Sequence, residues 1–216
     1  GRRIRLLDVG FGLGCNAMSA FRLANEIKAG TLEIISLEAD PGVLSAALAL
    51  PGLPDPALFE ELAAKRTVRG SHASVRLIFG DARTTAASLE GPFDIIFLDG
   101  FSPDVNPELW TADFIALLAR PLAPDGILTT YSSAYPLFGA LFEAGLKIYR
   151  SEPFGRRRPG TVASRTALAL EGLSPKDDAI TLKSTAGVPY RDPGLACTRE
   201  TIFAIRKDEV ANLRAQ

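Results

Sequence analysis

The stretch LDVGFGLGCNAM, residues 7–18, joins an apolar run to a helical pattern through three glycines. Gly10, Gly12 and Gly14 allow the backbone to turn tightly and approach a ligand, and the N-terminus of the following helix favours negative charge. A dinucleotide fingerprint would have its third glycine at position 15, where this chain has Cys15. The observed spacing, G-x-G-x-G, therefore favours S-adenosylmethionine over a dinucleotide, although a plain tight turn would also use these glycines.

The same alternation of apolar runs and helical stretches continues along the chain. The runs are apolar at successive positions, which indicates strands buried on both faces and hence a mostly parallel sheet. We expect a doubly wound, Rossmann-like α/β fold of the class I methyltransferase type. Its predicted strands are 4–9, 32–38, 75–81, 93–99 and 126–132, and its predicted helices are 14–29, 41–49, 83–89, 107–120 and 134–144.

The remaining segments determine the expected domain organisation. Residues 51–72, with three prolines and a short charged helix, are interpreted as a surface insertion, and residues 146–151 and 164–172 as a closing antiparallel hairpin. The methyltransferase domain would span 1–172, with an extension at 173–216 that ends in an amphipathic helix at 199–214. Because the sequence starts directly in a strand, we expect natural N-terminal residues to be missing.

The composition excludes several functional classes. Hydrophobic content of 47% and charged content of 23% are typical of a globular protein, and no apolar run reaches the roughly 20 residues of a membrane span. The only two cysteines lie far apart, as expected for reduced thiols in a cytoplasmic protein. A single histidine, His72, argues against a His-rich metal site or a Ser-His-Asp triad, so no metal is expected.

Acidic residues end the three later strands of the predicted sheet. Glu38 is placed to accept hydrogen bonds from ribose hydroxyls, and Asp81 from an adenine amino group. A solvated carboxylate and a helix N-cap are the simpler interpretations of these two residues. Because ligands bind at the carboxyl ends of strands in open α/β sheets, the glycine loop, Glu38, Asp81 and Asp99 together predict one cofactor site.

Asp99 opens the stretch DGFSPDVNPELW. A carboxylate beside a sulfonium could orient the N–H bonds of an amine acceptor and stabilise the charge that methylation creates. Phe101 offers a face for stacking on a base, and Asn106 is expected to cap a helix beginning at Pro107. Helix capping explains Asn106 and Pro107, but not Asp99.

These motifs resemble the methyltransferase module of the bacterial MnmC family of tRNA-modification enzymes. The resemblance rests on DVGFGLGCN, SLEADP, FLDGFSPDVNPELWT, EAGL and PFGRRR, which occur in the family's order over about residues 4–165. It implies methylation of the aminomethyl group on a wobble uridine of tRNA. By that resemblance Gly10, Gly12, Gly14, Asn16, Glu38 and Asp81 would hold S-adenosylmethionine, and Asp99 would be the catalytic carboxylate.

The chain departs from the fused MnmC pattern in ways that bear on its substrate. No FAD-dependent oxidase module follows, so the chain resembles the stand-alone form, and a separate enzyme would supply the aminomethyl-uridine. Clustered Arg156, Arg157 and Arg158 suit phosphate contacts to tRNA, with a solvated basic turn as the simpler alternative.

Two other functions fit parts of the sequence. A small-amine transferase resembling spermidine synthases would share the glycine loop and the acidic strand ends, but would be expected to carry more carboxylates around its amine. A non-catalytic, Rossmann-like RNA-binding scaffold would retain the arginine cluster and lose the acids at the strand ends, whereas all three acids are present here.

Overall fold

A computed structural model describes residues 1–153 and 159–215 of the chain. Its contacts divide the chain into two compact units, Gly1–Asp99 and Gly100–Gln216. We call them unit 1 and unit 2 and describe each by itself. The expected arginine cluster, residues 156–158, lies outside the described residues.

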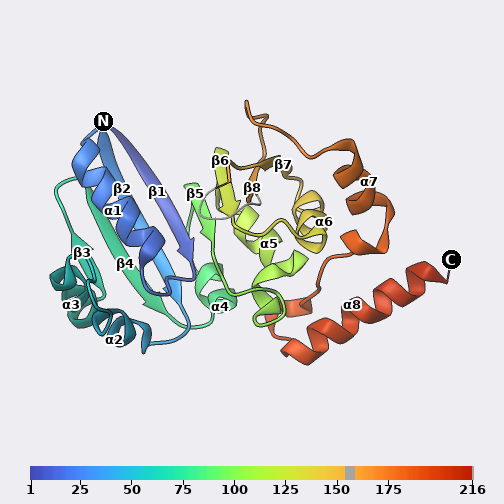
Figure 1. Cartoon of the computed structure of the whole chain (residues 1–216), viewed down its shortest axis with the longest axis horizontal. Coiled ribbons are helices and arrows are strands. Elements are labelled where there is room, and N and C mark those ends of the chain that lie inside the picture. Colours follow the sequence, from blue (N-terminus) through green and yellow to red (C-terminus); the bar gives the residue numbers. More distant parts are fainter. Residues whose placement is uncertain (154–158, 216) are drawn as a thin grey trace. The chain divides into compact units, whose positions relative to one another are not determined.

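Unit 1 is built on parallel strands in the order β3-β4-β2-β1-β5 (Figure 1). Strands β4, β2, β1 and β5 are parallel, and β3 runs antiparallel to β4. The chain moves outward from β1 to β2 and β4 and then returns to the other side of β1, so the topological switch point lies between β1 and β5. The elements are β1 (Arg2–Val9), α1 (Cys15–Ile27), β2 (Gly30–Glu38), α2 (Val43–Leu48), α3 (Pro56–Lys65), β3 (Thr67–Arg69), β4 (Ala73–Phe79), α4 (Ala82–Ala87) and β5 (Phe93–Leu98).

The core of unit 1 lies between one face of the sheet and the helices α1, α2 and α3. Leu6 of β1 and Ile34 of β2 cluster there with Met18 of α1. The segment 51–72 forms α3 and β3, and its Phe59 and Leu62 belong to the same buried cluster. Burial of these side chains supplies the main driving force for folding of the unit.

Unit 2 contains three antiparallel strands in the order β6-β8-β7, with helices following them. Thr111, Ser174 and Thr198 each cap the helix that they precede by accepting a backbone N–H. The elements are η1 (Pro107–Trp110), α5 (Ala112–Ala119), β6 (Leu122–Thr130), α6 (Tyr135–Glu143), β7 (Lys147–Arg150), β8 (Thr161–Ser164), α7 (Pro175–Lys183), η2 (Thr185–Gly187), η3 (Pro193–Leu195) and α8 (Arg199–Arg214).

The predicted α/β class, with a mostly parallel sheet and antiparallel C-terminal strands, is confirmed, and so is the terminal helix at 199–214. The predicted second strand of the hairpin was wrong. It lies at 161–164 instead of 164–172, because four successive buried residues there pair with β7. The expected cap at Asn106 was also wrong, since its side chain accepts no capping hydrogen bond and the short helix after it is of the 3-10 type.

Two searches of the described residues complete the picture. Over 1–153 and 159–215, no helix combines the length and the apolar character that crossing a membrane requires. The same residues hold no group of three His, Cys, Asp or Glu side chains suited to a metal ion.

Candidate cofactor and catalytic site

The glycine loop follows β1 and is tied to the end of β2. The backbone N–H groups of Gly10 and Phe11 both donate to the carbonyl of Leu37 at 3.0 Å. Gly14 has a φ of 79°, and a Cβ there would lie 2.8 Å from the Phe11 ring and 2.9 Å from the Phe59 ring. Gly12 has a φ of 52°, and a Cβ there would meet no atom within 4 Å. The loop is thus tightly packed at Gly14 and open at Gly12, where a ligand can approach the backbone.

Glu38 at the end of β2 holds this loop in place. Its Oε2 accepts the N–H of Gly12 at 2.8 Å, while Oε1 accepts those of Ala39 and Asp40 at 2.8 and 2.9 Å. A carboxylate has about four acceptor positions, and three are used by these amides. One position on Oε2 therefore remains for a ligand hydroxyl, and the loop and the acid form one hydrogen-bonded element.

Asp99 directly follows β5, on the other side of β1 from β2. The side-chain N–H of Asn16, in the first turn of α1, donates to its Oδ2 at 2.6 Å, and the Asp99 N–H donates to the Val9 carbonyl at 2.9 Å. Among the described residues nothing donates to Oδ1, and the residue is exposed. Asn16, expected at the cofactor, therefore fixes the orientation of the Asp99 carboxylate.

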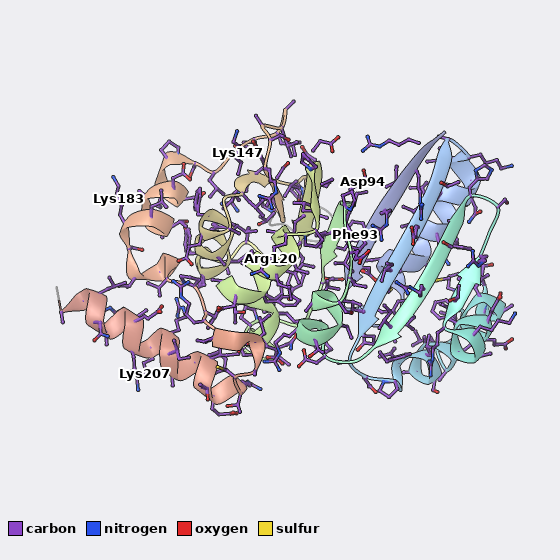
Figure 2. All side chains as sticks on the ribbon, turned by 180° about the vertical axis from the view of Figure 1, so that it is seen from behind. Phe93, Asp94, Arg120, Lys147, Lys183 and Lys207 are labelled. Atoms are coloured by element: carbon purple, nitrogen blue, oxygen red, sulfur yellow. The ribbon has the colours of Figure 1, made fainter. Side chains whose placement is uncertain are left out.

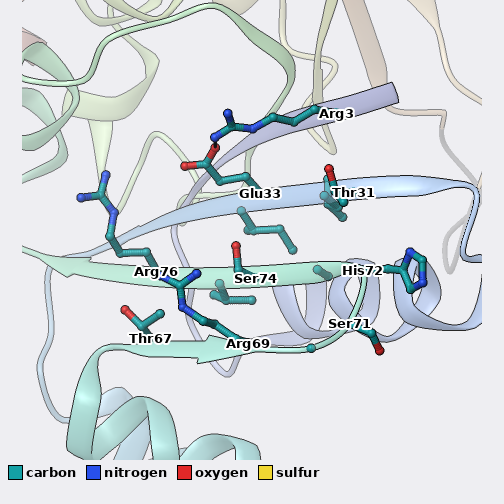
Figure 3. Close-up of a pocket in the computed structure, with 14 residues that line it drawn as sticks. Arg3, Thr31, Glu33, Thr67, Arg69, Ser71, His72, Ser74 and Arg76 are labelled. Atoms are coloured by element: carbon teal, nitrogen blue, oxygen red, sulfur yellow. Dashed lines mark hydrogen bonds and ion pairs between the residues drawn. The ribbon is translucent and has the colours of Figure 1, made fainter. Parts of the chain in front are cut away.

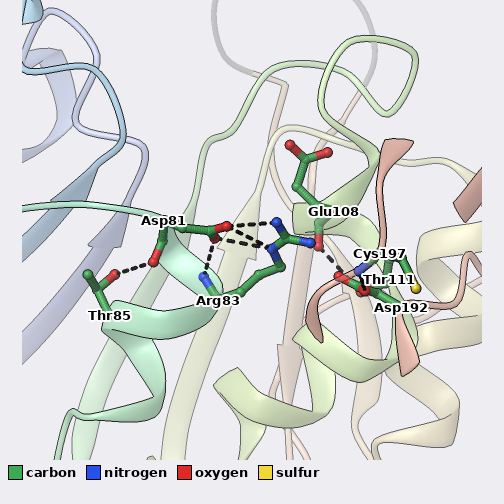
Figure 4. A network of polar contacts seen from close by, with 7 residues as sticks. All are labelled: Asp81, Arg83, Thr85, Glu108, Thr111, Asp192 and Cys197. Atoms are coloured by element: carbon green, nitrogen blue, oxygen red, sulfur yellow. Dashed lines mark hydrogen bonds and ion pairs between the residues drawn. The ribbon is translucent and has the colours of Figure 1, made fainter. Parts of the chain in front are cut away.

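Asp81 follows β4 and caps α4, as its simpler interpretation predicted. Its Oδ1 accepts the N–H of Arg83 at 2.8 Å, and the Arg83 guanidinium contacts both oxygens, with Nη2 to Oδ2 at 2.7 Å (Figure 4). Burial alone would raise the pKa of Asp81, but the hydrogen bonds and the charge of Arg83 lower it below its usual value. The carboxylate is therefore ionised, and an adenine amino group would share it with Arg83.

The analysis of the sequence missed Asp8, which lies inside β1. Asp8 and its register partner Ser36 on β2 are both 0% exposed, and the Ser36 hydroxyl donates to Asp8 Oδ2 at 2.7 Å. Burial raises the pKa of Asp8 to about 7; the Ser36 hydrogen bond lowers it, and the charges of Asp99 and Glu38 raise it further. Polar residues at matching positions of two consecutive apolar runs were the available signal.

The loop after Asp99 is fixed within unit 2 by two aromatic side chains. Trp110, 1% exposed, donates its indole N–H to the Phe101 carbonyl at 2.7 Å, and the Tyr131 hydroxyl donates to the Gly100 carbonyl at 3.0 Å. The two rings form an edge-to-face pair with centroids 5.7 Å apart. Phe101 itself is 76% exposed, so the loop presents this ring to solvent while its backbone is held.

The family model described as S-adenosyl-L-methionine-dependent methyltransferase matches residues 57–166 of this chain. The crystal structure of MnmC2 from Aquifex aeolicus is similar to it with 33% identity and a TM-score of 0.84, covering 98% of this chain and 69% of that chain. The chain belongs to the S-adenosyl-L-methionine-dependent methyltransferase family. Its cofactor is therefore S-adenosylmethionine, as the glycine spacing predicted.

Curated relatives of this methyltransferase are longer than the part that it matches. The tRNA 5-methylaminomethyl-2-thiouridine biosynthesis bifunctional protein MnmC of Pseudomonas fluorescens is 32% identical over 173 residues, which cover 73% of this chain and 26% of that protein. The protein of the same name from Azoarcus is 34% identical over 173 residues, covering 72% and 27%. This methyltransferase thus spans about a quarter of the length of these two relatives.

Proposed function

We propose that this chain methylates the aminomethyl group of a modified wobble uridine in tRNA, forming methylaminomethyl-(2-thio)uridine. The names of the MnmC2 and MnmC relatives support tRNA as the substrate. The observation that carries the proposal is the Asp99 carboxylate, oriented by Asn16 at the switch point and with Oδ1 available for an amine. A separate enzyme would supply the aminomethyl-uridine.

The residues around the glycine loop fit S-adenosylmethionine. The open space at Gly12 admits the cofactor to the loop backbone, and the fourth acceptor position of Glu38 suits a ribose hydroxyl. Gly10 and Gly14 shape the loop, and Asp81 retains lone pairs for the adenine amino group. Bound there, the cofactor supplies an activated methyl group on a sulfonium.

Asp99 acts on the amine that receives this methyl. The amine must be neutral to attack; its nitrogen forms a bond to the methyl carbon while the carbon–sulfur bond breaks, and the product amine is cationic until it loses a proton. Asp99 Oδ1 accepts an N–H of the amine, directing its lone pair, and the carboxylate stabilises the positive charge that develops. Asn16 prevents the carboxylate from turning away. Phe101 would stack on a base of the tRNA, and Arg156, Arg157 and Arg158 would contact its phosphates.

The test uses tRNA that lacks the final methyl, labelled S-adenosylmethionine and nucleoside mass analysis. We expect Asp99→Asn to reduce the rate of methyl transfer by about 100-fold, the size typical of losing one group that stabilises developing charge. S-adenosylhomocysteine affinity should remain, because Asp99 is assigned to the amine. Asp104→Asn, a change in an exposed carboxylate of the same loop, is the matched control and should leave the rate unaltered. Transfer at the wild-type rate by the Asp99→Asn protein would disprove the proposed role.

A further inference from the structure

One face of the unit 1 sheet changes character along its length. Neighbouring residues of a strand point to opposite faces, so Leu6 and Ile34, which pack with α1, leave Leu7 and Ile35 on the other face. Leu7 and Ile35 are buried at 0% and 1% exposure. Towards the amino ends of the strands the same face becomes polar, and Figure 2 shows the strands of unit 1 in front of α1 on this side.

The strand register gathers arginines on this polar half. Arg5 of β1 is opposite Glu33 of β2, Glu33 is opposite Ser74 of β4, and Ser74 is opposite Arg69 of β3. Arg76 and Arg3 lie in the two flanking rows, opposite Thr67 and Thr31. We call this surface the arginine face; it is formed by Arg3, Arg5, Glu33, Arg69, Ser74 and Arg76 (Figure 3).

The charges of the arginine face are unbalanced. Glu33 forms ion pairs with both Arg3 and Arg5. Arg69 and Arg76 are exposed and have no acidic partner among the residues that the structure describes. They flank a hollow of about 440 Å³ whose lining also includes the hydroxyls of Thr31, Thr67 and Ser74. This is a site with excess positive charge and several hydrogen-bond donors.

Such a site suits phosphate groups. Guanidinium groups bind phosphate oxygens through two parallel hydrogen bonds, and hydroxyls add neutral donors. Glu33 and Glu38 are five residues apart on β2, which corresponds to about 17 Å. A ligand that occupies the arginine face and also reaches the cofactor end of the same sheet is therefore long, as a polynucleotide backbone is.

We propose that the arginine face binds the phosphate backbone of the tRNA substrate, outside the nucleotide that is methylated. This inference rests on the proposed function for the identity of the nucleic acid. Arg69 and Arg76 make the phosphate contacts. Arg3, held by Glu33, limits how closely the backbone can approach β1.

The test compares the wild type with Arg69→Thr/Arg76→Thr, which removes two charges and keeps residues that favour strands. Filter binding of the unmethylated tRNA over a series of KCl concentrations should show roughly 10-fold weaker affinity and a salt slope lower by about two. Arg69→Lys/Arg76→Lys should retain most of the slope. Arg120→Thr/Arg214→Thr, a change of two exposed arginines of unit 2, is the matched control and should bind like the wild type. Arg120 is labelled in Figure 2.

Two further readouts separate this proposal from its alternatives. Binding of S-adenosylhomocysteine should be equal in all variants, which shows that the threonine variant is folded. An isolated anticodon stem-loop that wild type and variant bind equally well would assign the lost contacts to the rest of the tRNA. Because binding is measured without turnover, a failure of the proposed methyl transfer leaves the comparison readable. Unchanged tRNA affinity and salt slope in the threonine variant would overturn the proposal, as would a wild-type dimer that the variant dissolves.

Discussion

The buried carboxyl of Asp8 gives the stability of this protein a specific pH dependence. Asp8 is 0% exposed, and burial raises its pKa from 3.8 to about 7. Between these two values the folded protein holds a proton on Asp8 that the unfolded chain has released. The stabilisation is therefore complete below pH 3.8 and is lost as the pH rises to about 7, at about 1.4 kcal/mol per pH unit over most of that range.

Asp8→Asn removes this dependence while keeping the size of the side chain. Integrating the two titrations from pH 5 to pH 8 gives a loss of about 2.5 kcal/mol in wild type that the variant does not suffer. Other carboxyl groups titrate in both proteins, so their contributions cancel in the difference. Relative to wild type, the Asp8→Asn protein should therefore gain about 2.5 kcal/mol of unfolding free energy over this interval.

The assay is urea unfolding followed by circular dichroism at several pH values from 5 to 8. Asp208→Asn, a change in an exposed carboxylate of α8, is the matched control, and its profile should follow that of the wild type. Parallel profiles for wild type and Asp8→Asn would refute the reasoning, because they would mean that Asp8 titrates alike in the folded and unfolded chain.

Three other changes test particular contacts. Glu38→Gln leaves one acceptor oxygen for three amides, including that of Gly12, so S-adenosylhomocysteine affinity measured by calorimetry should fall about 10-fold; equal affinity would contradict the role of Glu38. Trp110→Phe loses the hydrogen bond to the Phe101 carbonyl and some buried volume, and urea unfolding should show a loss of about 2 kcal/mol. Thr198→Ala removes the cap of the last helix and should cost about 1 kcal/mol in the same measurement, whereas Thr198→Ser should cost little.

Most of the fold could be predicted because long apolar runs have few alternatives. The runs ending at Val9, Glu38 and Leu98 became parallel strands because such residues must be covered on both faces. The three-residue strand β3 was not predicted, since so short a segment depends on its neighbour β4 and has no periodicity of its own.

The site was predictable in position but not in its hydrogen bonds. Chain order and strand ends brought Asn16 and Asp99, 83 residues apart, to the same region, but only the folded geometry gives the contact between them. For Asp81 the sequence could not reveal that Arg83 would occupy both carboxylate oxygens, because that depends on one side-chain rotamer. Asp8 was missed since its run is otherwise apolar, and what distinguishes Asp8 is the register with Ser36.

The contact between Trp110 and the Phe101 carbonyl also has an experimental use. Trp110 is the only tryptophan of the 216 residues, so indole fluorescence excited selectively reports on a single place in the molecule. That place anchors the loop that directly follows Asp99. Emission from the unlabelled protein can therefore follow, in real time and without an engineered probe, whether the loop rearranges when cofactor or tRNA is added.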